Sequence, residues 1–178
     1  MGNDLATDLR AAIRDIPDFP RPGVLFRDVT TLLLRPSLFC QAVEALWVPF
    51  AGERVTHIVA LEARGFIFGG AMAALHRLPL VIMRKPGKLP AAIHAEEYEL
   101  EYGRAQLEVH KDGLGPGDRS VIVDDVLATG GTAAAAGRLV ERCGASLAGY
   151  SFLAELEYLG GRQKLRGAPV VSLVRYAG

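Results

Sequence analysis

The chain has 178 residues, of which 50% are hydrophobic and 22% are charged. This length predicts one domain with a single well-filled core, and the composition excludes the low hydrophobicity and high net charge of a disordered chain. Twenty basic residues balance twenty acidic residues, so no global field favours nucleic acid or an anionic membrane. Any anion site must therefore be local.

The cysteines and the hydropathy of the chain indicate in which cellular compartment the protein works. Cys40 and Cys143 lie far apart and lack Cys-x-x-Cys spacing, so we expect buried free thiols rather than a zinc site or a disulfide framework. None of the four histidines shows metal-ligand spacing. No apolar run reaches the roughly 20 residues that a membrane span needs. These features predict a cytoplasmic protein with no membrane partner.

The first elements in chain order are two amphipathic helices. Residues 4–15 carry apolar side chains at helical spacing, and Pro17 follows them, so a short helix should lead into a stiff loop. Residues 37–47 repeat the helical spacing, with Ser37 available as an N-cap.

The rest of the chain alternates short Val- and Ile-rich runs with helical segments, a pattern typical of an α/β fold with a mainly parallel sheet and right-handed crossovers. Residues 84–110 break this rhythm and predict a mobile loop followed by an antiparallel excursion. No linker divides the chain. The expected strands are residues 57–61, 80–83, 120–124, 149–153 and 169–173, and the expected helices are residues 65–75 and 132–143.

Residues 121–132 carry the strongest chemical signal, VIVDDVLATGGT. An apolar strand ends at two carboxylates and turns through residues 128–132 into a helix, at the sheet edge where ligands of parallel sheets bind. The unpaired N–H groups and the dipole of the helix attract phosphate there. Gly130 and Gly131 allow close backbone approach, while Thr129 and Thr132 add hydroxyl donors.

The neighbouring carboxylates, Asp124 and Asp125, would repel phosphate oxygens but can accept hydrogen bonds from sugar hydroxyls. The segment therefore suits a ribose 5-phosphate better than a triphosphate. The alternative is that the acids only cap the helix and the glycines only form a turn, but the ordered run of suitable residues favours a ligand site. No Walker-type loop and no Gly-x-Gly-x-x-Gly occurs, which argues against a nucleotide triphosphatase or a dinucleotide enzyme.

This segment resembles the phosphoribosyl pyrophosphate (PRPP) motif of the type I phosphoribosyltransferases. Between about Ile13 and Tyr176, four further segments make the chain similar to the adenine phosphoribosyltransferases. The resemblance implies that family's fold, with a base-recognition hood over residues 1–35, a flexible lid over residues 84–100 and usually a homodimer. The four segments are FPRPGVLFRD (19–28), LEARGF (61–66), RKPGKLP (84–90) and LEYG (100–103).

The resemblance implies a purine-salvage transferase that converts adenine and PRPP to AMP and pyrophosphate. Mg²⁺ would be held mainly through the substrate, with Asp124 as the candidate protein ligand. The leaving pyrophosphate requires cations, and an oxocarbenium-like ribose requires carboxylates. Arg64 and Lys88 should therefore bind pyrophosphate oxygens, with Arg84 and Lys85 beside them. Arg84 and Lys85 could instead form a solvated basic loop or serve a neighbouring subunit's site.

Other roles follow from the same resemblance. Glu101 is implied as the acid or base at adenine N7, worth roughly 10²- to 10⁴-fold in rate, although it also lies on an acidic strand face. Tyr102 would close over the site. A non-proline cis peptide is implied near Glu62 and Ala63. The residues implied to bind PRPP or AMP are Arg64, Arg84, Lys88, Tyr102, Asp124, Asp125, Ala128, Thr129, Gly130, Gly131 and Thr132.

Adenine recognition is implied for Leu25, Phe26 and Arg27, where a proline-stiffened loop can present backbone groups to the base and Phe26 a stacking face. Leu156 resembles the residue that covers the other face of the base, although Leu153 or Leu156 could equally be core. Fixed backbone groups can distinguish the amino group of adenine from the carbonyl of hypoxanthine.

Two rival functions stay open. One is a sister enzyme that acts on guanine, xanthine or a pyrimidine. The other is a non-catalytic PRPP sensor that binds nucleic acid, against which stand Glu101, the zero net charge and the lack of appended DNA-binding helices. For the dimer, Phe66, Ile67 and Phe68 are candidate interface residues, with core packing as the default for at least two of them.

Overall fold

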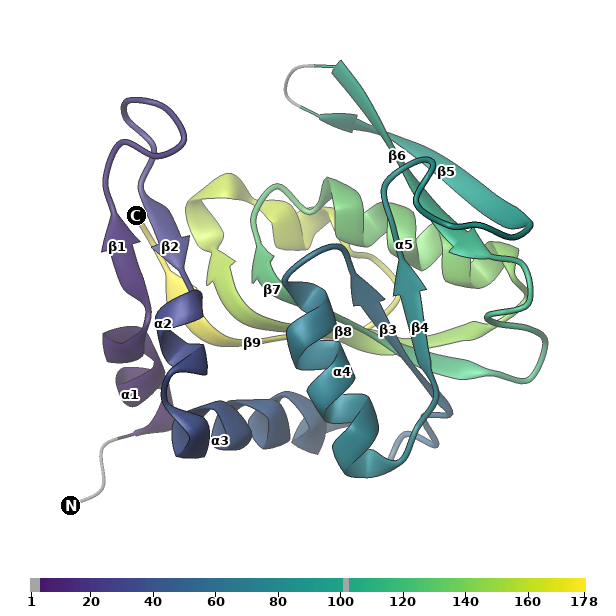
Figure 1. Cartoon of the computed structure of the whole chain (residues 1–178), viewed down its shortest axis with the longest axis horizontal. Coiled ribbons are helices and arrows are strands. Elements are labelled where there is room, and N and C mark those ends of the chain that lie inside the picture. Colours follow the sequence, from purple (N-terminus) through teal and green to yellow (C-terminus); the bar gives the residue numbers. More distant parts are fainter. Residues whose placement is uncertain (1–3, 101–102) are drawn as a thin grey trace.

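The computed structural model describes residues 4–100 and 103–178. Its centre is a parallel sheet of five strands in the order β4-β3-β7-β8-β9 (Figure 1), which confirms the predicted α/β class. β3 and β4 have the predicted bounds, whereas the other three strands run further, and β7 continues through both carboxylates to Leu127. The strands are β3 (His57–Leu61), β4 (Leu80–Met83), β7 (Arg119–Leu127), β8 (Ser146–Leu156) and β9 (Val170–Tyr176).

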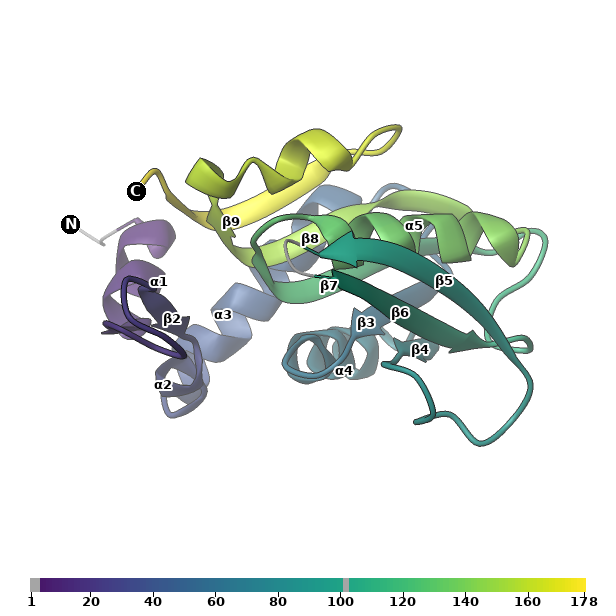
Figure 2. The same cartoon turned by 90° about the horizontal axis from the view of Figure 1, so that it is seen from above.

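Helices cover both faces of the sheet (Figure 2). α3 (Pro36–Trp47) and α4 (Gly65–His76) pack on the face that carries Val123, and α5 (Gly131–Arg142) packs on the face that carries Ile122. Because successive strand residues point to opposite faces, one apolar strand supplies both cores. Three short 3₁₀ turns complete the helical part, namely η1 (Val48–Phe50), η2 (Glu157–Leu159) and η3 (Gly161–Lys164).

The N-terminal residues form a small hood beside β9 (Figure 1). The predicted helix over residues 4–15 is wrong beyond Ala12, because Ile13 has extended backbone and the residues after it pair with a second strand. Cross-strand hydrogen bonds here override the helical spacing of the apolar side chains. The hood comprises α1 (Leu5–Ala12), the antiparallel strands β1 (Arg14–Ile16) and β2 (Phe26–Asp28), and α2 (Thr30–Leu33).

An antiparallel hairpin of β5 (Ile93–Leu100) and β6 (Gly103–His110) lies against α5. It confirms the predicted antiparallel excursion. A regular strand begins at Ile93, so the irregular part of the predicted lid is limited to residues 84–92. Arg84 pairs its backbone with Glu108 of β6 at 2.9 and 2.7 Å, which attaches the start of this loop to the hairpin.

Two local predictions are wrong. α3 begins at Pro36 with Arg35 as its N-cap, so Ser37 lies inside the first turn instead of capping it. Proline suits that position because the first helical N–H would have no partner. Cys40 is exposed, whereas Cys143 is buried as expected.

In the described part of the chain, no helix is both long and apolar enough to cross a membrane.

Asp28 ties the hood together. Its Oδ1 accepts hydrogen bonds from the Thr30 hydroxyl at 2.6 Å and the Thr30 backbone N–H at 3.0 Å, and its Oδ2 accepts one from Arg14 Nη2 at 2.5 Å. The Thr30 hydroxyl, then Arg14, lower the pKa of Asp28 from 3.8 to about 2. Because this pKa is lower in the folded state than in the unfolded chain, the carboxylate stabilises the fold above pH 3.8 and stops doing so as the pH falls through 2.

We therefore expect Asp28→Asn to lower the free energy of unfolding by about 2 kcal/mol at pH 7, with roughly half of that difference gone at pH 3. Urea unfolding of both proteins across this pH range measures the effect. A difference that does not change with pH would show that the carboxylate charge is not what stabilises the hood.

Candidate active site

The connections of the sheet change direction between β3 and β7. β3 continues through α4 to β4 on one side, and β7 continues through α5 to β8 on the other. Ligands of open parallel sheets bind outside the strand ends at such a switch point. Arg64 follows β3 there, while Asp124 and Asp125 lie near the end of β7, just before residues 128–132, which we call the glycine loop.

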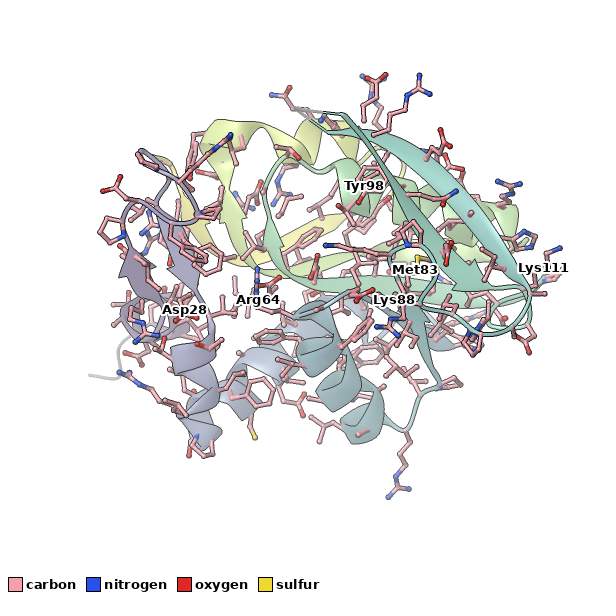
Figure 3. All side chains as sticks on the ribbon, turned by 45° about the horizontal axis from the view of Figure 1, so that its top comes forward. Asp28, Arg64, Met83, Lys88, Tyr98 and Lys111 are labelled. Carbon is pink, nitrogen blue, oxygen red and sulfur yellow. The ribbon has the colours of Figure 1, made fainter. Side chains whose placement is uncertain are left out.

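A cleft of about 900 Å³ opens at this switch point, between the hood and the sheet. Figure 3 shows Arg64 between Asp28 of the hood and Tyr98 of the hairpin. The wall also contains residues for which the sequence analysis predicted no role, including Arg21, Tyr158 and Leu159. The predicted site residues that line the cleft are Leu25, Phe26, Arg27, Arg64, Lys85, Asp124, Asp125, Ala128, Thr129 and Leu156.

Arg64 and Asp125 form an ion pair in the cleft wall. Arg64 Nε donates a short hydrogen bond to Asp125 Oδ2, and the two side chains are 41% and 6% exposed. A buried carboxylate thus holds a guanidinium that stays accessible from the cleft. The guanidinium carbon lies 5.4 Å from the centre of the Phe26 ring, which connects this pair to the hood.

Asp124 lies beside this pair. Burial, and then the charge of Asp125, raise the pKa of Asp124 well above its usual range. Its Oδ1 accepts a hydrogen bond from the Asp125 backbone N–H at 2.9 Å. A Cβ on Gly65 would lie 2.7 Å from the same oxygen, so the first residue of α4 must be glycine for this carboxyl to fit. A carboxyl group with a raised pKa can both donate and accept hydrogen bonds next to sugar hydroxyls.

The glycine loop touches a second glycine segment, backbone against backbone. Gly130 has φ of 74°, and a Cβ there would lie 2.3 Å from the carbonyl oxygen of Gly161. A Cβ on Gly161 would lie 2.1 Å from the carbonyl oxygen of Ala128. Gly161 was not among the predicted site residues, and the adjacent Gly160-Gly161 pair was the only signal that could have indicated it.

The hood and the end of β8 form the other end of the cleft. Leu153 is buried in the core, while Leu156 is half-buried, packs against the core and also lines the cleft, so its contact with the base stays a prediction. The Arg27 guanidinium pairs with Asp15 at 2.5 Å and lies 3.9 Å from the centre of the Tyr176 ring. The charged end of Arg27 is therefore engaged within the protein, and the role of this segment in base binding stays a prediction.

Comparison with known proteins places this architecture in a family. The phosphoribosyl transferase domain matches residues 41–159. An adenine phosphoribosyltransferase from Synechococcus is 52% identical over 95% of this chain and 99% of its own length, and one from Methylococcus capsulatus is 53% identical over 94% and 98%. The chain belongs to the adenine phosphoribosyltransferase family.

Solved structures of adenine phosphoribosyltransferases share the fold. The Rhodothermus marinus protein is 47% identical, with a TM-score of 0.93 over 97% of this chain and 98% of that one. The Saccharomyces cerevisiae protein, crystallised with adenine and an imino-altritol bisphosphate, is 42% identical, with a TM-score of 0.90 over 95% and 98%. The predicted family, type I fold and transferase activity are confirmed.

In this member of the adenine phosphoribosyltransferase family, the far end of the glycine loop lies under the hairpin. The Thr132 hydroxyl donates to the Tyr98 hydroxyl at 3.1 Å, and a Cβ on Gly131 would lie 3.3 Å from the Glu99 carbonyl oxygen. Gly131 and Thr132 thus pack on the hairpin and Gly130 packs on Gly161, and none of the three is among the residues that line the cleft. Their contacts with phosphate stay predictions.

Glu62 accepts hydrogen bonds from two residues at the start of the predicted lid, Arg84 and Lys85. Arg84 Nη2 donates to Glu62 Oε1 at 3.2 Å, and the Lys85 backbone N–H donates to Oε2 at 2.9 Å. The Lys85 N–H, and then Arg84, lower the pKa of Glu62. Lys85 lines the cleft, while in the view of Figure 3 Lys88 lies beyond Arg64 on the side of the hairpin. The implied cis peptide between Glu62 and Ala63 is confirmed.

Two predicted residues, Glu101 and Tyr102, lie outside the described residues, and their roles stay predictions. Across residues 4–100 and 103–178, no group of three His, Cys, Asp or Glu side chains is arranged to hold a metal ion.

Proposed function

We propose that this chain transfers ribose 5-phosphate from PRPP to N9 of adenine, giving AMP and pyrophosphate in purine salvage. The observation that carries the proposal is the switch-point cleft. Its wall brings together the groups that AMP requires, namely Ala128 and Thr129 of the glycine loop, the hood segment Leu25 to Arg27, and Asp124, Asp125 and Arg64. We assign the loop to the phosphate, the hood to the base and the three charged residues to the reacting ribose.

The charged groups of the cleft suit the transfer step. The N–H groups of the glycine loop and the Thr129 hydroxyl bind the 5-phosphate, and Asp124 and Asp125 bind ribose hydroxyls. Arg64, held in place by Asp125, and Lys85 stabilise the negative charge that develops on the departing pyrophosphate. Since these groups are positioned before the substrate arrives, little reorganisation is required during the reaction.

Base recognition falls to the hood and the end of β8. The backbone of Leu25, Phe26 and Arg27 contacts the Watson–Crick edge of adenine, and Phe26 and Leu156 cover its faces. Glu101 acts as the acid or base at N7. The Arg27 contact with Tyr176 supports this assignment, since it ties the recognition strand β2 to the sheet.

Mg²⁺ is part of the proposal. The cleft fits it as an ion held mainly by pyrophosphate and ribose oxygens, because Mg²⁺ commonly takes one or two carboxylates together with substrate phosphates. Asp124 is the carboxyl that would complete the set, and a bound cation would favour its ionised form. When bound, Mg²⁺ neutralises charge on the leaving group.

A cytoplasmic homodimer completes the proposal. Phe68 is buried in the core and Phe66 is half-buried, but Ile67 is 39% exposed on α4, which starts next to Arg64. An interface over this face would cover an apolar side chain beside the cleft. Light scattering of the purified protein measures the assembly, and a monomer would contradict it.

The purified chain tests the function when it is supplied with PRPP, Mg²⁺ and one base at a time. We expect AMP from adenine, and nucleotide from hypoxanthine or guanine slower by roughly 10⁴-fold or more, because fixed backbone groups leave a mismatched base edge unpaired. Equal turnover of hypoxanthine would support the sister-enzyme rival. No product with any base, together with a shifted DNA band in a gel, would support the sensor rival.

A further inference from the structure

The segment after β8 supports both ends of the cleft. Tyr158 and Leu159 of η2 line its wall, and Gly161 then contacts the glycine loop at Ala128 and Gly130. Gly161 begins η3, a single short 3₁₀ turn that no strand ladder holds in place, so its position depends on a separate support.

That support is the next residue, Arg162. Its Nε and Nη2 donate to the two carboxylate oxygens of Glu155 at 2.9 and 2.5 Å. Its Nη1 donates to the Val170 carbonyl oxygen at 2.7 Å, and Nη2 also donates to the Ser172 hydroxyl at 3.2 Å. One guanidinium therefore connects the start of η3 to both β8 and β9.

We call the Arg162–Glu155 pair the clamp, and its second member, Glu155, also lies next to the glycine loop. Glu155 is 3% exposed, and its register partner in β7 is Leu127, the last residue before the loop. Its hydrogen bond with Arg162 lowers the pKa of Glu155. A bidentate arginine–carboxylate pair fixes direction as well as distance, which a lysine cannot do.

We propose that Arg162 is a positioning residue for the transfer reaction, which holds Gly161 against the glycine loop so that the loop keeps its phosphate-binding shape before PRPP arrives. The inference rests on the proposed role of the glycine loop. The residue itself does not touch the substrate. Its effect is expected on the phosphate end of the ligand, because the atoms nearest to a Cβ on Gly161 belong to Ala128 and Gly130 of the glycine loop.

The test compares Arg162→Gln and Arg162→Lys with Arg166→Gln, a control that removes an exposed arginine four positions along the chain. We expect Arg162→Gln to raise KM for PRPP and Kd for AMP about tenfold, in the range seen when an outer support of a binding site is removed. Kd for adenosine, which lacks the phosphate, should change little. Arg162→Lys should recover part of the loss, and Arg166→Gln should behave as the unmodified chain.

Two results would overturn the inference. One is a lowered melting temperature with unchanged KM for PRPP and unchanged Kd for AMP, which would make the clamp purely structural. The other is an equal loss of AMP and adenosine affinity. If Arg162→Gln fails to fold, Arg162→Lys provides the same comparison. Gly130→Ala separates this inference from the proposed function, because unchanged AMP affinity in that variant would remove the glycine loop itself from the phosphate site.

Discussion

Replacing Gly130 with alanine is expected to lower kcat/KM for PRPP about 100-fold or more. Its φ of 74° is in the left-handed region, and the new Cβ would lie 2.3 Å from the Gly161 carbonyl oxygen. A hydrogen bond to a charged group contributes roughly 1.5–3 kcal/mol, and every 1.4 kcal/mol is about tenfold in affinity or rate, so losing two such bonds to the 5-phosphate corresponds to about 100-fold or more. Since the contact is backbone against backbone, the glycine loop has to shift, and its N–H groups no longer converge on a phosphate. Initial rates with varied PRPP at saturating adenine measure the effect.

Gly167→Ala is the matched control. Gly167 has φ of 82°, and a Cβ there would meet none of the described atoms within 4 Å. The control therefore carries the same backbone strain without the collision in the site. It should lose some stability and keep its kinetics. If the two variants have the same kcat/KM for PRPP, the contact between Gly130 and Gly161 does not shape the site.

Features of the site that depend on neighbours in sequence could be predicted. Short Val- and Ile-rich runs located β3 and β4, and two adjacent carboxylates before Gly130 and Gly131 indicated a ligand loop at the start of α5. Both signals are local, because a short apolar run and the unpaired N–H groups of a helix start arise within about ten residues.

Features that depend on contacts between distant segments could not be predicted. Arg64 was expected to face pyrophosphate, but its pairing with Asp125, 61 positions away, has no signature in the sequence. The same applies to Gly161 against the glycine loop. In the hood, the helical spacing of residues 4–15 predicted the wrong element after Ala12, because pairing with β2 decides the conformation there.

The Arg64–Asp125 pair leads to the second large effect. Asp125→Asn is expected to lower kcat/KM for PRPP by about 30- to 300-fold. Removing one partner of a buried, hydrogen-bonded charge pair costs roughly 2–5 kcal/mol, and we expect the lower part of this range because Arg64 is half-exposed. Two losses contribute, since asparagine removes a sugar-binding carboxylate and also releases the cation that faces the leaving group. Glu53→Gln is the control, because its pair with Arg119 is on the surface, at 2.8 Å with side chains 50% and 34% exposed, and should not affect kinetics.

A double variant separates these two losses. If Asp125 acts by positioning Arg64, then Arg64→Gln and Asp125→Asn overlap, and the double variant is less impaired than the product of the two single effects. The part of the Asp125 effect that persists in the Arg64→Gln background measures the sugar contact alone. Effects that simply multiply would mean that the two side chains act independently, and that the ion pair in the cleft wall contributes nothing to the placement of Arg64.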